Sequence, residues 1–262
     1  MTTRLADLPT RSGPGDLIRY WRARRHLTQQ QLAVECRVSA RHLSFIETGR
    51  SKPSPDMIIR VCEYLDVPLR HRNDILLAAG YAPAYGESSL EEPSMAQVSA
   101  ALIQLLDGHL PYPALVVDRH WTMIDANAGI DPLVAGCAPE LLEPPVNVLR
   151  LSLHPNGMAP RIRNLPQWRG HILARLEHQL RATGDTQLAH LRDELQDYPG
   201  GTDHAAPGSL VVPLRLEVGG RELSFFSTTT IFGTPMDVTV AELAIESFFP
   251  ADEETSRRLH AT

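Results

Sequence analysis

The chain has 262 residues, with 25 Lys+Arg against 31 Asp+Glu and a formal net charge of −6. That length suits two compact domains of about 100–150 residues each. No apolar run reaches the roughly 18 residues of a membrane helix, and the N-terminus lacks the apolar segment of a secretory signal. The three cysteines, Cys36, Cys62 and Cys137, have no metal-site spacing and make a disulfide framework improbable, so we expect a cytoplasmic protein.

Charge is distributed unevenly along the chain. Residues 1–80 hold 13 Lys+Arg and 8 Asp+Glu, a net charge of +5, whereas residues 81–262 hold 12 and 23, a net charge of −11. A basic N-terminal part followed by an acidic remainder indicates that only the first part binds a polyanion.

After a flexible N-terminus at residues 1–15, residues 16–80 are predicted to form five short helices. The second helix begins at Thr28, which makes a capping box with Gln31, and the third begins after the N-cap Ser39. Two short helices joined by a tight turn, with supporting helices around them, describe a helix-turn-helix unit.

The motif L-T-Q-Q-Q-L-A-x5-S-x-R-x-L-S-x-I-E-x-G-R-S-x-P-S, from Leu27 to Ser54, resembles the Xre/Cro-type family of DNA-binding regulators. One departure is Arg37, which stands in the turn where that family often has Gly. A non-Gly residue with positive φ is tolerated there at a modest energetic cost, so we expect the same fold. The resemblance implies a double-stranded DNA operator as partner.

The third helix is expected to enter the major groove with its N-terminal half. Four of its side chains are expected to face the bases: Ala40, Arg41, Ser44 and Phe45. Arg41 is the sharpest candidate because a guanidinium can donate two hydrogen bonds to guanine. Six residues are expected at the sugar-phosphate backbone: Thr28, Gln29, His42, Arg50, Ser51 and Lys52. Glu47 is expected to pair within the domain, and the arginines between Arg19 and Arg25 either add phosphate contacts or are solvated.

Residues 81–94 are rich in Pro, Gly, Ser and Glu and are predicted to form a linker, followed by a second domain at residues 95–262. That domain opens with a helix over about 94–106, an interdomain or dimer element. The elements predicted after it are strands at 114–117 and 121–125, helices around Trp168–Leu180 and Leu188–Leu195, strands at 210–217, 222–231 and 241–249, and a helix at 252–259. This order favours an α+β domain with a small antiparallel sheet and helices packed on it.

Three strings in the second domain, N-V-L-R-L-S-L-H-P-x-G, F-S-T-T-T-I-F-G-T-P-x-D-V-T and I-E-S-F-F-P-A-D, resemble the MmyB-like ligand-binding domain, a PAS-like module. The resemblance spans about Pro111 to Leu259. It implies a transcription regulator whose pocket accepts a small, largely apolar molecule, for which fatty acids are one class. A single recognition helix reads few base pairs, so we expect a homodimer on two half-sites.

The pocket is expected to be mainly apolar with a few polar anchors. Candidates are His154, Trp168, His171, Ile172, Arg175, Phe226, Thr228, Thr230 and Phe232. Strand alternation places Phe226, Thr228 and Thr230 on one face and Phe225, Ser227 and Thr229 on the other, and the sequence leaves open which face is inward.

Enzyme motifs are absent from the sequence: there is no G-x-S-x-G elbow, P-loop or G-x-G-x-x-G, and the histidines have no metal-ligand spacing. We therefore expect no catalytic residue, cofactor or metal. Two alternatives stay open. The second domain could only dimerise or bind a protein partner, or it could be catalytic, which would need an acid–base pair inside the pocket.

Overall fold

The computed structural model describes residues 12–203 and 211–261, so most of the predicted N-terminal segment, residues 1–11, lies outside the described residues. The chain divides into two compact units, the first holding residues up to Glu87 and the second most of the remaining chain. We call them the helical unit and the sheet unit. None of the helices described is both long and apolar enough to span a bilayer.

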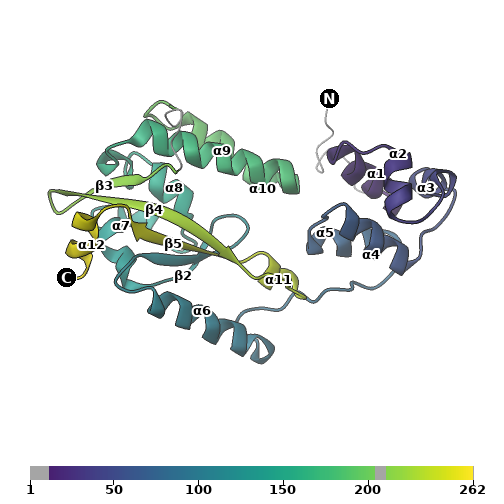
Figure 1. Ribbon diagram of the computed structural model, residues 1–262, viewed down its shortest axis with the longest axis horizontal. Coiled ribbons are helices and arrows are strands. Elements are labelled where there is room, and N and C mark those ends of the chain that lie inside the picture. The colour runs from purple at the N-terminus through teal and green to yellow at the C-terminus, as the bar shows by residue number, and fades with distance from the viewer. Residues whose placement is uncertain (1–11, 204–210, 262) are drawn as a thin grey trace. The chain divides into compact units, whose positions relative to one another are not determined.

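Between residues 12 and 87 the chain forms five helices, which confirms the predicted all-α unit (Figure 1). Their bounds are α1 Pro14–Arg24, α2 Gln29–Glu35, α3 Ala40–Glu47, α4 Pro55–Tyr64 and α5 Leu69–Ala78. The side chains of Thr28 and Ser39 cap α2 and α3 by accepting from the backbone amides of Gln31 and His42. Arg37, in the turn between these helices, has φ 55°.

The core of the helical unit contains fully buried side chains from α1 to α5, among them Trp21, Leu32, Leu43, Ile58 and Leu76. These are the apolar positions of amphipathic helices, which explains why such short helices are stable together.

The helical unit extends beyond residue 80 into the predicted linker. The Asn73 side chain donates to the carbonyl of Tyr85 (2.8 Å) and accepts from the amides of Ala84 (3.0 Å) and Tyr85 (3.2 Å). Arg70 pairs with Glu87 at 2.6 Å. The segment 81–87 is thus bound to α5, because Asn73 satisfies its backbone polar groups.

The sheet unit alternates helices with a five-stranded sheet. Its elements are η2 Pro93–Met95, α6 Ala96–Gly108, β1 Ala114–Val117, β2 Met123–Ala126, η3 Ala128–Ile130, α7 Asp131–Val134, η4 Pro139–Leu141, α8 Val148–Leu153, η5 Ala159–Arg161, α9 Leu165–Thr183, α10 Thr186–Asp197, β3 Leu214–Val218, β4 Arg221–Ile231, α11 Val238–Ala241, β5 Ala244–Pro250 and α12 Glu253–Leu259.

All strand pairs are antiparallel, in the order β2-β1-β5-β4-β3, as predicted for an α+β domain. β3 and β4 form the hairpin expected at Gly219-Gly220, both of which have positive φ. The neighbouring strands β4 and β5 align Ser227 with Phe248 and Thr229 with Glu246. This register places Ser227 and Thr229 on the same face as Glu246 and Phe248.

The sheet is sandwiched between helices. α9 and α10 cover one face and α6 covers the other (Figure 1). On the α9 face, Leu115, Leu216 and Phe225 join the helix side chains in the main core. On the α6 face, Ala114, Val116 and Ile245 pack with Leu102 and Leu106.

Three predicted strands begin later than expected. Trp121 ends a turn instead of starting β2: its φ is 68°, and the Asp118 carboxylate accepts from the amides of His120 and Thr122. Before β5, the predicted start at Ala241 lies in the helical turn α11, so the strand begins at Ala244. For β3, the predicted first residue Leu210 is outside the described residues, and the strand begins at Leu214.

Candidate nucleic-acid interface and ligand cavity

Helix α3 presents a polar, exposed face. Leu43 and Ile46 are buried and fix the helix on the core, whereas Ala40, Arg41 and His42 are exposed. Ser44 and Phe45 are half-buried. The four candidate base-facing residues therefore all lie on α3, on parts of its surface that the core does not fully cover.

Phe45 supports two arginines at this surface. The guanidinium carbon of Arg41 lies 5.3 Å from the centroid of the Phe45 ring, and that of Arg50 lies 5.9 Å from it. Both distances are in the range of cation–π attraction. Phe45 thus holds Arg41, a candidate for base contact, and Arg50, a candidate for phosphate contact, beside one another.

Glu47 is the buried polar centre of the helical unit, with a side chain that is 0% exposed. Its carboxylate accepts from Arg22 Nε (2.6 Å), Arg22 Nη2 (2.8 Å) and Gln29 Nε2 (2.7 Å). The internal pairing expected for Glu47 is present. The Gln29 side chain, expected at phosphate, is instead engaged inside the unit because the buried carboxylate needs its donor.

The arginines between Arg19 and Arg25 each have a partner within the helical unit, and the pair of Arg19 with Asp16 is exposed at the surface. Arg19 pairs with Asp16 at 2.6 Å, and Arg24 donates to the Tyr20 hydroxyl. Arg25 donates to the carbonyls of Leu65 and Asp66.

The remaining backbone-contact candidates lie at the helix starts and in the loop after α3. The Thr28 hydroxyl is occupied by Gln31 in the capping box. The amides of Arg50 and Ser51 both donate to the Phe45 carbonyl, so this loop offers its side chains. Lys52 is exposed, with Nζ 4.4 Å from the Tyr81 ring centroid.

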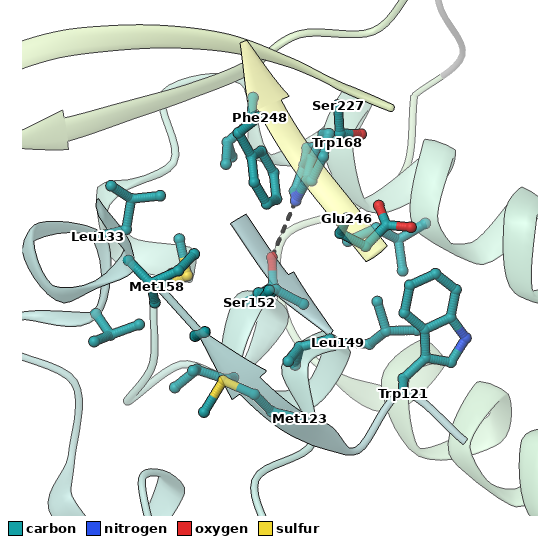
Figure 2. Close-up of a pocket in the computed structure, with 18 of the residues that line it drawn as sticks. Trp121, Met123, Leu133, Leu149, Ser152, Met158, Trp168, Ser227, Glu246 and Phe248 are labelled. Carbon is teal, nitrogen blue, oxygen red and sulfur yellow. Dashed lines mark hydrogen bonds between the residues drawn. The ribbon is translucent and has the colours of Figure 1, made fainter. Parts of the chain in front are cut away.

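A cavity of about 180 Å³ lies in the sheet unit between the α9 face of the sheet and the helices α7, α8 and α9. Its wall is mostly apolar and includes Leu115, Trp121, Met123, Ile130, Leu133, Leu149, Leu151, Met158, Trp168, Ile172, Leu214 and Phe248. Figure 2 shows Leu133 and Met158 on one side of the cavity, and Trp121 and Glu246 on the opposite side. Concave, largely apolar sites of this kind bind small molecules.

Four of the nine candidate pocket residues line this cavity: Trp168, His171, Ile172 and Arg175, all on α9. Phe226, Thr228 and Thr230 do not line the cavity, contrary to the prediction, because they point to the other face of β4. On that face Phe226 stacks on Phe249, with ring centroids 5.5 Å apart. Phe232 packs with the α6 cluster. The His154 ring lies against Tyr198 and does not line the cavity.

The polar end of the cavity is an ion pair between the predicted pocket residue Arg175 and Glu246, a nearly buried residue that the sequence analysis did not identify. Arg175 donates through Nη1 to Glu246 Oε2 (2.9 Å) and through Nη2 to Glu246 Oε1 and the Thr229 hydroxyl. Its guanidinium carbon lies 4.5 Å from the centroid of Trp121. A single acidic residue within the otherwise uncharged strand A-I-E-S-F-F was the available signal for Glu246.

Two further polar groups lie on the wall. The Trp168 indole donates to the hydroxyl of Ser152 at 3.0 Å (Figure 2). Burial lowers the pKa of the His171 imidazole, and the neighbouring Arg175 charge lowers that pKa further. His171 is therefore mainly neutral near pH 7. In the described part of the chain, no three His, Cys, Asp or Glu side chains gather as a metal site would require.

Comparison with known families matches both units. A helix-turn-helix model matches residues 18–71, and the model of the MmyB-like transcription regulator ligand binding domain matches residues 98–261. No curated protein matches the chain.

Solved structures give partial similarity. Two crystal structures of the clp gene regulator ClgR from Corynebacterium glutamicum are 32% and 28% identical; they cover 28% and 40% of this chain and 91% and 97% of their own, each with a TM-score of 0.24. An RNA-binding Light-Oxygen-Voltage receptor is 13% identical, with coverage of 94% of this chain and 62% of its own and a TM-score of 0.28.

Proposed function

The chain belongs to the helix-turn-helix transcription regulators with an MmyB-like ligand-binding domain, and we propose how it reads DNA and what it senses. These families are families of regulators and not of enzymes. In the proposal, α3 lies in the major groove and presents Ala40, Arg41, Ser44 and Phe45 to the bases. The observation that supports it is the exposed Arg41 guanidinium held beside Phe45.

Backbone contacts in this proposal surround α3. Arg50 and Lys52 contact phosphates through their charges, with Ser51 and His42 beside them. At the start of α2, contact comes from the backbone amides after the Thr28 cap, including that of Gln29, because the first amides of a helix lack partners within it. The protein acts as a homodimer on two half-sites, and α6, which exposes Ile103 (51%) and Leu105 (50%), supplies part of the dimer contact.

The sensing half of the proposal rests on the cavity of the sheet unit. Its wall of aliphatic, aromatic and methionine side chains fits a small, largely apolar molecule, fatty-acid-like in having a hydrocarbon chain. The ligand then changes DNA affinity only if it binds two states of the protein differently.

Native mass spectrometry of protein purified without denaturation tests this function. We expect an adduct with the mass of a small lipid. Ala126→Trp adds a bulky side chain to the cavity wall and should abolish the adduct, whereas Ala174→Trp, on the exposed side of α9, should retain it. Protein that is adduct-free and that also fails to take up any amphiphile would instead favour a second unit that only dimerises or binds a protein partner.

A further inference from the structure

The charges on the cavity wall restrict which ligand it can hold. In the part of the chain that the structure describes, three charged side chains line the cavity: one cation, Arg175, and two carboxylates, Glu246 and Asp131. The titratable His171 is mainly neutral because burial and Arg175 both lower its pKa. The wall therefore has no net positive charge.

Among the described residues of this wall Arg175 is the one cation, and its charge is already compensated. Both of its terminal nitrogens bind the two oxygens of Glu246, and the Thr229 hydroxyl donates to Glu246 Oε1 at 2.8 Å. The Glu246 side chain is only 5% exposed, and that of Arg175 is 30% exposed. Two-point pairing of this kind is strong and directional, so a ligand carboxylate would have to displace a buried, triply bound one.

A ligand anion that did not displace Glu246 would lie beside a neutral pair, with Asp131 adding a negative charge at an exposed position of the wall. Burying a carboxylate without a compensating charge is strongly unfavourable. An uncharged ligand head group fits this wall better, because His171, Ser152 and Ser227 offer it neutral hydrogen-bond donors and acceptors.

We propose that the cavity selects an amphiphile with a hydrocarbon tail and an uncharged, hydrogen-bonding head group, such as an alcohol, ester or amide, over the corresponding carboxylate. This inference rests on the proposed ligand-sensing function and narrows the fatty-acid-like class to its uncharged derivatives. The Arg175–Glu246 pair determines this specificity, because it places a polar but overall neutral group beside the ligand's head group.

Isothermal titration calorimetry on the intact protein, stripped of any bound lipid, with decanol, decanoate and decylamine tests the inference. At about pH 8 decanoate is ionised, because an ordinary carboxyl pKa is about 4. We expect decanol to bind at least about tenfold more tightly than decanoate or decylamine. Equal or tighter binding of either ion overturns the inference and leaves ligand sensing intact. Binding of none of the three overturns both.

Glu246→Gln makes the same test sharper. The variant leaves the Arg175 charge uncompensated, so decanoate affinity should rise at least about tenfold while decanol affinity changes less than about threefold. The double variant Arg175→Gln/Glu246→Gln buries no charge and should keep the preference for decanol, which guards against misfolding of the single variant. Glu222→Gln, in the exposed pair with Arg215, is the matched control. A gain of decanoate binding in the double variant, or none in a folded Glu246→Gln protein, contradicts the inference.

Discussion

Arg41, the residue proposed to read a base, is already restrained in the protein without DNA. Its backbone belongs to a capped helix, and its guanidinium is held near the Phe45 ring. A side chain that is already restrained loses less conformational entropy on binding. The same ring holds Arg50, so one aromatic residue orients both a base-reading and a phosphate-binding candidate.

Replacement of Arg41 by Ala should remove sequence preference without unfolding the protein. Loss of a bidentate contact to guanine costs about 1–3 kcal/mol per site, so selected and random duplexes should bind with affinities that differ by far less than in the wild type. Fluorescence anisotropy titrations on both duplexes measure this ratio. Arg221→Ala, which removes the same charge from the β3–β4 hairpin, should leave it unchanged. An unaltered ratio in the Arg41 variant would exclude α3 as the reading helix.

Loss of the Glu47 charge should strongly destabilise the helical unit. Glu47→Gln leaves Arg22 without its buried partner, and breaking such a pair costs about 3–5 kcal/mol. A denaturant titration followed by circular dichroism should show this loss. Glu222→Gln, which removes an exposed pair, should cost under about 1 kcal/mol. Equal costs for the two variants would mean that the Glu47 site is not a structural centre.

At the scale of single residues, the sequence predicted that Glu47 pairs within the domain but not which residues it pairs with. Glu47 could be assigned to an internal role because phosphate repels a carboxylate. The partners of that carboxylate, Arg22 and Gln29, could not be found, because they lie 25 and 18 residues away and meet it only through packing of α1 and α2 on α3.

The turn between α2 and α3 requires one residue in the left-handed backbone conformation. Arg37 occupies the left-handed region with φ 55°, which costs a non-Gly residue about 1–2 kcal/mol. Arg37→Gly should therefore raise the free energy of unfolding of the helical unit by about 0.5–1 kcal/mol. Gly49→Ala, at φ 72° after α3, should lower it by a similar amount. Thermal unfolding of both variants provides the measurement, and destabilisation by Arg37→Gly would refute the strain argument.

Helices α8 and α10 are joined by hydrogen bonds to the Glu194 carboxylate, whose protonation depends on pH. Arg150 donates to Glu194 at 2.7 and 2.8 Å, and the Tyr198 hydroxyl also binds Glu194. The Arg150 hydrogen bond, followed by that of Tyr198, lowers the pKa of Glu194 against the opposing effect of burial. A lowered carboxyl pKa stabilises the fold above the unfolded value near 4.3, and this stability is lost as pH falls through the folded value.

Comparison of wild type with Glu194→Gln checks that sign. The wild type should have the higher Tm near pH 7, and the difference should shrink as pH falls from about 6 to about 3. A Tm difference that is constant over this range would show that Glu194 does not titrate with folding.

Most elements could be predicted because their signals are local. Capping residues, Gly219-Gly220 and helical spacing lie within a few residues of what they specify. The inward face of β4 could not be predicted, because Phe225, Ser227 and Thr229 and their neighbours Phe226, Thr228 and Thr230 have nearly the same polarity. Pairing with β5 decides it, since Glu246 and Phe248 share the face of Thr229 and Ser227 and contact α9 residues or the cavity.

On the scale of the whole molecule, the N-terminal and C-terminal parts of the chain differ in net charge and in the kind of site that they contain. Residues 1–80 have a net charge of +5 and contain the helix-turn-helix, whereas residues 81–262 have a net charge of −11 and contain the apolar cavity. DNA binding should accordingly weaken steeply with salt, since each phosphate contact releases counterions. Regulation requires that occupancy of the sheet unit and DNA affinity of the helical unit be coupled, and such coupling is reciprocal.

The most direct test of this account is the DNA affinity of the intact protein with its cavity empty and filled. The duplex is one selected from a random pool by the protein itself, and the ligand probe is decanol, at a fixed salt concentration. The account predicts that anisotropy titrations give Kd values that differ by at least about fivefold between the two states. Identical Kd values, with calorimetry showing decanol bound, would contradict it.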